Sequence, residues 1–397
     1  MMKVLHVIGS MNPIYGGPCQ GVRNLASASG KFNVEREVLC LDDPASDFIN
    51  KESFPIYAIG PRKGVWWYCS KLIPWLTNNA RKYDVIVING LWLYLSFAVW
   101  KVMKLLKNQS KLENIKVPRF FVMPHGMLDP YFQLASNRKL KAIRNSIYWR
   151  LIEHRVVNEV DGVLFTCEEE LQLAKQSFDS YRPKQEINIG YGIAPPPAFS
   201  PILTDAFFKI CPGLNGQPYL LFLSRINYKK GVDLLIKVYQ NILSKNPDIP
   251  KLVIAGPGLD SEYGQEIMQL VDSHLLNKNI FFPGLLMGDA KWGAIYGSEV
   301  FILPSHQENF GIAVVEALAC NVPVLISNKV NIWREIEMNQ GGIIFPNSIE
   351  GLQSTLERWI SLTDAQKRLI KTNAKRTYES QFAIEPVVDR FVDAVGV

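Results

Sequence analysis

The chain has 397 residues, of which 48% are hydrophobic and 20% are charged, and its formal net charge is +6 at pH 7. Because that length exceeds what one hydrophobic core usually serves, we expect two domains; the composition excludes a disordered chain, and the mild charge does not by itself indicate nucleic acid. The six cysteines are scattered without a C-x-x-C pair, which indicates reduced packing thiols in a cytosolic protein rather than a zinc site or a disulfide framework.

The first half of the chain alternates short β-branched runs with amphipathic stretches. The strands that we expect are 4–9, 35–41, 84–90, 119–123 and 162–166. This alternation predicts a parallel, doubly wound sheet with helices on both faces. The apolar run in MMKVLHVIGSMNP is too short for a signal peptide and is expected to form the first strand.

Two segments of this half carry a second interpretation. Residues 85–106 are apolar over a length that could span a bilayer, but Asn89-Gly90 interrupts them, so a strand, a turn and a buried helix are favoured. Residues 137–155, NRKLKAIRNSIYWRLIEHR, hold a local excess of positive charge. This basic segment is either a solvated helix face or a surface attracted to an anionic membrane or a phosphate-bearing substrate.

The second half repeats the pattern after a break. Three consecutive prolines and a stretch without periodicity predict a linker at 191–208. The expected strands then follow at 219–224, 251–256, 279–284, 299–305, 322–327 and 341–345, with helices at about 231–244 and 262–275. The sequence therefore predicts an α/β architecture of two tandem Rossmann-like domains, 1–190 and 209–381, that face a central cleft. A last helix lies within 382–397.

Ligands of such domains bind where the strands end, so glycine, charge and histidine at those positions are candidates. Gly16-Gly17 follows the first strand, where it is either a floppy loop or a place of close backbone approach to an anion. This loop lacks the spacing G-x-G-x-x-G, and AGPGLDSEYG at 255–264 lacks its third glycine, so a nicotinamide dehydrogenase is disfavoured.

Other strand ends carry histidine or basic residues. His125 follows the strand at 119–123, between a proline and a glycine that fix an unusual turn. Arg225 and Lys230 stand at the head of a helix, where they are either solvated surface or a clamp for a diphosphate. Backbone groups beyond Gly284 are placed to hydrogen-bond the edge of a base.

Two glutamates lie in the mostly apolar segment 306–327. Glu308 belongs to a turn, and Glu316 follows eight residues later on a helix that begins at about Ile312. Eight residues leave them about 80° apart around a helix axis, so they are expected to contact different parts of one extended ligand. A buried carboxylate needs a partner, and the vicinal hydroxyls of a sugar and a ribose suit it.

The motifs together resemble those of the group 1 (family 4) retaining glycosyltransferases. The resemblance rests on E-x7-E, N-F-G-x4-E-A, Arg225-x4-Lys230-Gly231, I-A-G-P-G and H-G-M-L, and it covers nearly the whole chain. It implies the glycosyltransferase-B fold, with the active site between two Rossmann-like domains and a final helix that returns to the first domain. It also implies that a sugar nucleotide binds mainly to the C-terminal domain and the acceptor mainly to the N-terminal domain.

The resemblance further implies roles for individual residues. Arg225 and Lys230 would hold the donor diphosphate, Glu316 the ribose, and Glu308 the transferred sugar. The catalytic set is His125, Arg225, Lys230 and Glu308, and the donor-binding set adds Gly16, Gly17, Gly258, Leu285, Asn309, Phe310, Gly311, Ile312 and Glu316. On the acceptor side are Asn89 and Trp92 together with His125. In this hypothesis the ligand's hydroxyls pair with the two glutamates.

The chain departs from the family at two positions. Asn89 stands where many relatives carry histidine, and Tyr191 stands where asparagine commonly precedes the glycine. No D-x-D motif occurs, so we expect no metal and no other cofactor, because arginine, lysine and helix amides can neutralise a leaving diphosphate.

We therefore expect a metal-independent retaining glycosyltransferase that moves a hexose-type sugar to a glycan or a lipid-linked acceptor in surface polysaccharide biosynthesis. Its expected place is the cytoplasm or the inner face of the membrane, with peripheral contact through 137–155. A sugar-nucleotide epimerase or phosphorylase on the same fold, or a catalytically silent nucleotide- or glycan-binding scaffold, is the alternative.

Overall fold

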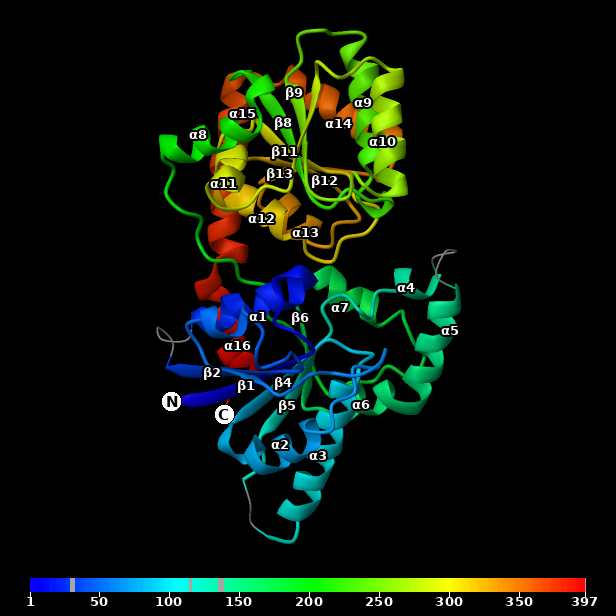
Figure 1. Cartoon of the computed structure of the whole chain (residues 1–397), viewed down its shortest axis with the longest axis vertical. Helices are drawn as coiled ribbons and strands as arrows, with labels where there is room; N and C mark the ends of the chain where they lie inside the picture. The colour runs from blue at the N-terminus through cyan, green and yellow to red at the C-terminus, as the bar shows by residue number, and fades with distance from the viewer. Residues whose placement is uncertain (29–32, 114–115, 135–138, 397) are drawn as a thin grey trace. The chain divides into compact units, whose positions relative to one another are not determined.

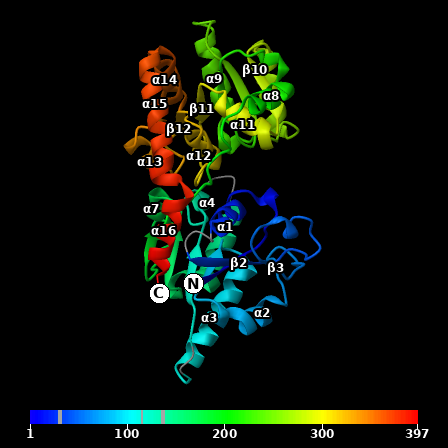
Figure 2. The ribbon, with the colours of Figure 1, turned by 90° about the vertical axis from the view of Figure 1, so that its left-hand side faces the viewer.

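The computed structural model describes residues 1–28, 33–113, 116–134 and 139–396. The chain divides into two compact units, which are Met1–Gly192 together with Ile384–Val397, and Ile193–Ala383. Each unit is a parallel sheet with helices on both faces, as Figures 1 and 2 show. The prediction of two Rossmann-like domains is confirmed.

The N-terminal unit has a seven-stranded sheet in the order β3-β2-β1-β4-β5-β6-β7, and every neighbouring pair is parallel. Its strands are β1 (Met2–Ile8), β2 (Val34–Cys40), β3 (Ile56–Ala58), β4 (Val85–Asn89), β5 (Arg119–Met123), β6 (Gly162–Phe165) and β7 (Glu186–Asn188). The five expected strands of this half are present within two residues at each end, whereas the three-residue edge strand β3 was not expected.

The helices of this unit cover both faces of the sheet. They are α1 (Gly17–Ser27), α2 (Leu72–Asn79), α3 (Tyr94–Ser110), α4 (Tyr131–Leu134), α5 (Lys139–Tyr148), α6 (His154–Glu159), α7 (Glu168–Ala174) and α16 (Ile384–Val395). Short turns add η1 (Pro13–Tyr15), η3 (Ile49–Lys51), η4 (Ala80–Lys82) and the π-helical η6 (Trp149–Glu153). Residues 85–106 form β4 and most of α3, and no helix of the described residues is long and apolar enough to cross a bilayer.

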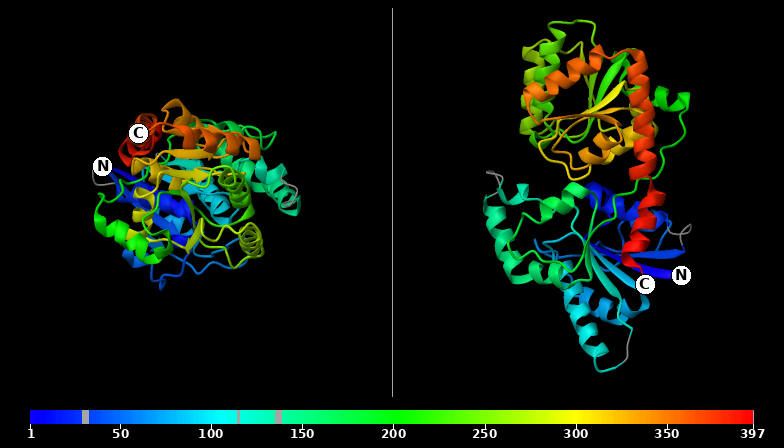
Figure 3. Two further views of the ribbon diagram at one scale, coloured as in Figure 1. Left: turned by 90° about the horizontal axis from the view of Figure 1, so that it is seen from above. Right: turned by 180° about the vertical axis from the view of Figure 1, so that it is seen from behind.

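The last helix completes the core of the N-terminal unit. Side chains of β1 alternate between two clusters, so that Leu5 and Val7 pack with α2 and α3, while Val4 packs with Phe391 and Val395 of α16. The right-hand view of Figure 3 shows this helix, drawn in red, beside the first sheet. The last helix of the described residues therefore belongs to the core of the unit that contains β1.

The C-terminal unit has a six-stranded parallel sheet in the order β10-β9-β8-β11-β12-β13. Its strands are β8 (Tyr219–Leu223), β9 (Lys251–Ala255), β10 (Ile280–Gly284), β11 (Val300–Leu303), β12 (Val324–Ser327) and β13 (Gly342–Phe345). Its helices are α8 (Pro201–Ile210), α9 (Val232–Leu243), α10 (Glu262–Ser273), α11 (Gly288–Tyr296), α12 (Ile312–Ala319), α13 (Trp333–Met338), α14 (Ile349–Ser361) and α15 (Asp364–Thr377), with short turns η7 (Pro212–Leu214), η8 (Tyr228–Lys230) and η9 (Tyr378–Phe382). In Figure 1, α9, α10 and α14 lie on one side of this sheet and α8, α11 and α15 on the other.

One part of the expected linker is a helix. Residues 201–208 belong to α8, whose Leu203 and Phe207 are buried and which packs against α11. A Cβ on Gly293 of α11 would lie 1.9 Å from the carbonyl oxygen of Leu203, so only glycine allows this close packing. The expectation that the linker extends to residue 208 was wrong, because the ten residues of α8 bury only two apolar side chains, Leu203 and Phe207, which are too few to show a helical period in the sequence.

Candidate functional site

The sheet of the C-terminal unit reverses its strand order between β8 and β11. At such a point the connections that follow two neighbouring parallel strands lead to opposite sides of the sheet. They leave a crevice between them at the carboxyl ends of the strands, and ligands bind there. The loops that follow these two strands are 224–231 and 304–311. They touch, because the backbone N–H of His306 donates to the carbonyl of Lys229 at 2.8 Å.

An ion pair joins the same two loops. The ammonium of Lys230 donates to Oε2 of Glu308, and the two side chains are only 8% and 24% exposed. Burial on its own raises the pKa of the Glu308 carboxyl, but the charge and hydrogen bond of Lys230, aided by Lys229, outweigh it and hold this pKa below its ordinary value. Glu308 is therefore an ionised hydrogen-bond acceptor at neutral pH.

The backbone behind Lys230 requires glycine. Gly231 has φ +66°, the left-handed conformation that ends η8 and begins α9. A Cβ at this position would lie 2.2 Å from the carbonyl oxygen of Pro304. Gly231 therefore sets how closely the two loops approach, and so places Lys230 beside Glu308.

The loop that carries Glu308 is also tied to the loop after β12. The N–H of Glu308 donates to Lys329 at 2.9 Å, and the N–H of Asn331 donates to the carbonyl of Glu308 at 2.9 Å. The side-chain amide of Asn331 reaches Oδ1 of Asn309 at 3.4 Å. The backbone around Glu308 and Asn309 is thus held on both sides.

The second glutamate also has a lysine partner. Glu316 lies on α12 and accepts a hydrogen bond from Lys291 of α11 at 2.8 Å, with side chains 13% and 23% exposed. The ammonium of Lys291 also lies 4.1 Å from the centre of the Trp292 ring. Each glutamate therefore has a lysine partner within the protein, and the pairing of both glutamates with a ligand's hydroxyls stays a prediction. An ionised carboxylate has about four acceptor positions, so a single lysine leaves room for hydroxyls as well.

The beginning of α12 offers backbone donors in this part of the unit. Gly311 is its N-cap with φ +80°, and no side chain caps the helix, so the amides from Ile312 onward are not satisfied by a capping side chain. Phe310 is buried and packs edge-on against Phe382 at 5.7 Å between ring centres. Arg225 in the loop after β8 is exposed and forms no ion pair with another described residue.

Gly258, which follows β9, and Gly284, which ends β10, differ in what surrounds them. Gly258 has φ +119°, and a Cβ on it would lie 2.4 Å from the carbonyl oxygen of Ile226, so it holds its loop against the loop that carries Arg225. Gly284 has φ +75° and open space around it, and Leu285 beyond it is 61% exposed. The predicted contacts of Gly258 and Leu285 with a donor remain predictions.

The N-terminal unit reverses its strand order between β1 and β4, and three polar side chains meet there. His125 Nε2 lies 3.1 Å from Oδ1 of Asn89, and Nδ2 of Asn89 lies 3.4 Å from Nδ1 of His6. Because Nδ2 also donates to the carbonyl of Val87 at 3.2 Å, the amide orientation is fixed by that acceptor. His125 therefore donates from Nε2, which leaves its Nδ1 as an acceptor.

Burial keeps both histidines neutral. It lowers the pKa of His125 to about 4 and that of His6, with a smaller effect from the charge of Arg36, to about 3. The backbone of His125 has φ +51°, and the N–H of Gly126 donates to the buried Glu170, which holds this unusual turn. The structure thus brings His125 and Asn89 together, as the prediction of a shared acceptor side requires.

Trp92 follows β4 in the same region and has φ +69°. Its backbone N–H donates to Oε1 of Glu153 at 2.8 Å, and this carboxylate also accepts from the hydroxyl of Ser96 at 2.6 Å. The ring of Trp92 packs among Tyr148 and other aromatic side chains.

Gly16 and Gly17 begin α1, and neither has an atom within 4 Å of the place where a Cβ would be. The hydroxyl of Tyr191 donates to the carbonyl of Gly17, and its ring lies where a side chain on Gly21 would be. The departure from asparagine at position 191 therefore has a packing role, because the larger side chain supports the first turn of α1.

Three residues of these groups were missed in the sequence: His6, Glu153 and Lys291. A histidine within the apolar run VLHVIG is a visible signal, because a buried imidazole needs a partner. Glu153 and Lys291 gave no such signal, since each lies in an ordinary amphipathic stretch.

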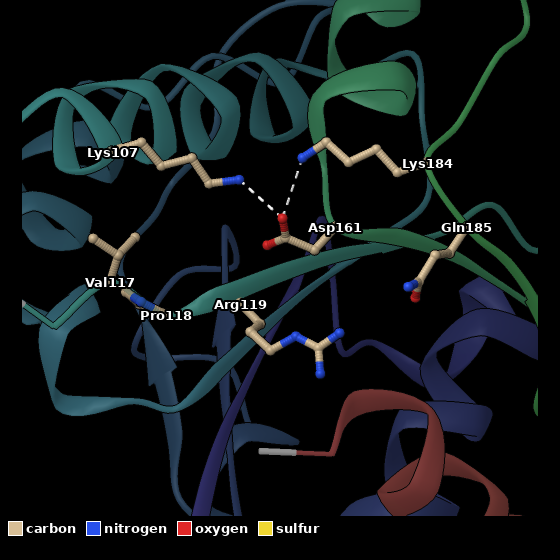
Figure 4. Close-up of a pocket in the computed structure, with 7 residues that line it drawn as sticks. All are labelled: Lys107, Val117, Pro118, Arg119, Asp161, Lys184 and Gln185. Atoms are coloured by element: carbon tan, nitrogen blue, oxygen red, sulfur yellow. Dashed lines mark hydrogen bonds and ion pairs between the residues drawn. The ribbon is translucent and has the colours of Figure 1, made fainter. Parts of the chain in front are cut away.

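A hollow of about 410 Å³ lies at the opposite edge of the N-terminal sheet, before β5 and β6. Figure 4 shows its lining, which consists of Lys107, Val117, Pro118, Arg119, Asp161, Lys184 and Gln185. Asp161 is already bonded to Lys107 at 3.0 Å and to Lys184 at 3.3 Å. None of the predicted site residues belongs to this hollow. Among the described residues, no group of three or more His, Cys, Asp or Glu side chains is placed to hold a metal ion.

Two family models match the chain. The model for "Glycosyl transferase 4-like domain" matches residues 16–188, and the model for "Glycosyl transferases group 1" matches residues 207–376. These two stretches lie in the N-terminal and the C-terminal unit, respectively.

Curated relatives match over part of their length. An uncharacterized glycosyltransferase of Methanocaldococcus jannaschii is 29% identical over 167 residues, which are 42% of this chain and 41% of that protein. The alpha-monoglucosyldiacylglycerol synthase of Streptococcus pneumoniae is 24% identical over 165 residues, which are 42% of this chain and 36% of that protein. The matches thus span less than half the length of these curated relatives.

Solved structures match over the whole chain. Anabaena HepE in complex with UDP and glucose aligns with a TM-score of 0.71 at 17% identity, covering 100% of this chain and 99% of that one. WaaG, a glycosyltransferase involved in lipopolysaccharide biosynthesis, aligns with a TM-score of 0.66 at 14% identity, covering 99% of each chain. At such identities the likeness shows the fold alone. With both halves matched by glycosyltransferase models and with this fold, the chain belongs to the group 1 glycosyltransferase family.

Proposed function

We propose that the protein is a metal-independent retaining glycosyltransferase, which moves a hexose-type sugar from a nucleotide-sugar donor to a glycan or lipid-linked acceptor in surface polysaccharide biosynthesis. The observation that carries the proposal is the ion pair between Lys230 and Glu308 where the strand order of the C-terminal sheet reverses. The donor binds to this unit and the acceptor to the N-terminal unit.

The charges around this point suit a diphosphate. Four cations (Arg225, Lys229, Lys230 and Lys291) and two glutamates belong to these loops and helices, and the uncapped N-terminus of α12 adds its positive end. Guanidinium and ammonium groups bind phosphate oxygens strongly, and they can stabilise a leaving diphosphate without a cation. The exposed guanidinium of Arg225 is the group that is available for this contact.

The two glutamates divide the sugar-nucleotide between them. Glu308 is ionised and fixed by Lys230, so it accepts from hydroxyls of the transferred sugar, and Glu316 on α12 accepts from the ribose. The amides of Phe310 and Gly311 lie beside the sugar. These roles follow from the motif resemblance and agree with the acceptor capacity that each lysine leaves.

The transfer is written without an enzymic nucleophile. The bond from the anomeric carbon to the diphosphate oxygen breaks, the acceptor oxygen bonds to the same face of the sugar, and the leaving phosphate takes the acceptor's proton. The neutral imidazole of His125, whose pKa lies at about 4, fits a hydrogen-bonding role beside the sugar and not proton donation at neutral pH.

The names of similar proteins support the substrate classes. One solved neighbour is in complex with UDP and glucose, which supports a nucleotide sugar as donor. One relative is named an alpha-monoglucosyldiacylglycerol synthase, and one solved neighbour is a glycosyltransferase involved in lipopolysaccharide biosynthesis. These names support a lipid-linked acceptor.

The test is a thermal-unfolding panel of UDP-, GDP-, ADP- and TDP-sugars. A ligand at a hundred times its Kd stabilises the folded protein by about 2.7 kcal/mol, which raises Tm by a few degrees. We expect one base to raise the Tm of the wild type but not of Arg225→Ala. The exposed Arg368→Ala on α15 is the matched control and should keep the shift.

Product analysis then separates the alternatives. Transfer to an acceptor with retained anomeric configuration supports the proposal, whereas an epimerised donor or a sugar phosphate formed without acceptor supports the epimerase or the phosphorylase. Nucleotide-sugar binding with no turnover under any acceptor would identify a silent scaffold.

A further inference from the structure

The basic segment presents an apolar stripe to solvent. Leu140, Ile143 and Ile147 of α5 and Leu151 of η6 are 84%, 58%, 56% and 62% exposed. Their spacing of three, four and four residues places them along one face of the helix. The opposite face is buried in the N-terminal unit through Asn145, Trp149 and Glu153. The helix is thus anchored on one side and apolar on the other.

The stripe is flanked by positive charge alone. Within residues 139–155 the exposed charged side chains are Lys139, Lys141, Arg144, Arg150 and Arg155. The only acidic residue of this range is Glu153, which is fully buried and bonded to Ser96 and the backbone of Trp92. None of the five cations forms an ion pair with another described residue. The face therefore combines large apolar side chains with unpaired positive charge.

A neighbouring helix adds one more exposed apolar side chain. α4 packs beside α5, and Leu134 at the end of α4 is 80% exposed. Figure 1 shows both helices at the outer edge of the N-terminal unit, away from its sheet. Residues 137 and 138 of the basic segment lie outside the described residues.

We propose that this face docks onto an anionic lipid bilayer, with α5 and η6 lying in the plane of the interface. A helix with apolar side chains on one face and Lys and Arg beside them binds at the headgroup boundary, where the chains enter the acyl region and the cations meet anionic headgroups. A second copy of the chain suits the face less well, because a two-fold contact through it would bring two sets of five cations together. The place of the acceptor at this membrane rests on the proposed function, whereas the binding itself does not.

The experiment is co-sedimentation of the full chain with vesicles of phosphatidylcholine, with and without phosphatidylglycerol. We expect binding to the anionic vesicles that weakens as salt is raised, because salt screens the headgroup charge. Ile143→Ser/Ile147→Ser should weaken binding at least about tenfold, and Lys141→Gln/Arg144→Gln about tenfold or more. Isoleucine and serine have similar helix propensities, so the first variant should keep α5 folded.

Matched controls lie on the C-terminal unit. Ile202→Ser/Leu369→Ser removes two apolar side chains that are 68% and 61% exposed, and Arg368→Gln/Lys371→Gln removes two exposed charges of α15. Both should leave vesicle binding unchanged. The nucleotide-induced rise in Tm should persist in all four variants, so a failure of vesicle binding is distinguishable from a failure of the donor proposal.

Three results would overturn the inference. One is that the wild type stays in the supernatant with anionic vesicles, and another is that the apolar variant and its control bind equally well. Alternatively, sedimentation without lipid would reveal a dimer that Ile143→Ser/Ile147→Ser dissociates, with no vesicle binding by the wild type. In that case the stripe is an interface between copies of the chain.

Discussion

The two glutamates of the C-terminal unit differ in the ligand group that we assign to each, and their variants should differ accordingly. Glu316→Ala removes the proposed ribose acceptor and should weaken nucleoside-diphosphate binding by about 1–3 kcal/mol, the usual effect of losing a charged hydrogen-bond partner. Glu308→Ala should spare the free nucleotide and instead lower transfer, because Glu308 contacts only the sugar. Calorimetric titration with the nucleoside diphosphate, followed by initial rates with the nucleotide sugar, measures both effects.

The lysine partners provide a control for this comparison. Glu308→Ala leaves the nearly buried Lys230 without its carboxylate, so it should also lower the free energy of unfolding. Glu316→Ala should lower it less, because its partner Lys291 is more exposed and lies over the ring of Trp292. Glu308→Gln keeps an acceptor beside Lys230 and tests whether stability explains the lost transfer. An equal loss of nucleotide affinity in Glu308→Ala and Glu316→Ala would contradict the division of roles.

Glu153 provides a pH-dependent prediction. Burial raises the pKa of its carboxyl from 4.5 to about 7, although hydrogen bonds from Ser96 and the backbone of Trp92 favour the ionised form. Between these values the unfolded chain has released this proton and the folded chain retains it, so this group's contribution to stability falls as pH rises and levels off above about pH 7. Glu153→Gln, which does not titrate, should gain about 3 kcal/mol in free energy of unfolding over the wild type between about pH 5 and 8.

Denaturant unfolding of both proteins across this pH range measures the difference. The neutral His6 and His125 contribute the opposite slope, because their pKa values of about 3 and about 4 lie below the ordinary value. Their contribution is common to both proteins and cancels in the comparison. If the difference in free energy of unfolding between Glu153→Gln and the wild type does not vary with pH, Glu153 is ionised over the whole of this pH range.

For individual residues of the site, the sequence indicated the residue types and their local positions but not the side chains that they contact. Glu308 in a turn, Glu316 on the helix and His125 after its strand were all predicted from neighbouring residues. The partners Lys230 and Lys291 lie 78 and 25 residues away from their glutamates, so no local period relates them. His6, Asn89 and His125 come from β1, β4 and the end of β5, and only the order of the strands brings them together.

Among the elements, the turn between η8 and α9 allows a matched test with glycine. Gly231 and Gly216 have φ +66° and +71°, but a Cβ on Gly231 would lie 2.2 Å from the carbonyl oxygen of Pro304, whereas Gly216 has nothing within 4 Å. Gly216→Ala should therefore cost about 1–2 kcal/mol of stability, which is the backbone term alone. Gly231→Ala should cost about 2–5 kcal/mol, because the clash adds to that term.

The same pair of variants tests the site. Relief of the clash at position 231 moves the loop that carries Glu308, so Gly231→Ala should lose the nucleotide-induced rise in Tm even where it is folded, while Gly216→Ala should retain it. Thermal unfolding with and without the nucleotide found in the panel measures this. Equal stability of the two variants would show that the loops relax without strain.

Most elements followed from the sequence because parallel strands buried on both faces are continuous β-branched runs. Runs such as VIVIN and KLVIA therefore gave strand bounds within two residues. Elements without such a signal were missed: β3 has only three residues, and α8 lies in a stretch assigned to the linker. Register and strand order were not available from any local pattern, because they depend on which runs pair.

For the whole molecule, α16 makes the stability of the N-terminal unit depend on the end of the chain. Phe391 is fully buried in one cluster with Val4, Val85 and Phe121, and the guanidinium of the buried Arg36 lies 4.9 Å from its ring centre. Phe391→Ala removes this ring from a closed core and should cost about 3–5 kcal/mol. Because each unit has its own core, we expect this loss in the unfolding transition of the N-terminal unit alone.

Phe207→Ala in α8 is the reciprocal variant, since Phe207 is fully buried in the C-terminal unit. It should lower the temperature of the unfolding transition of the C-terminal unit, which is the transition that nucleotide raises. The transition of the N-terminal unit should stay unchanged. Calorimetric scans of both variants with and without nucleotide assign each transition to its unit. If Phe391→Ala instead lowered both transitions together, the two units would unfold as one cooperative body, and the final helix would stabilise the whole chain and not only the sheet on which it packs.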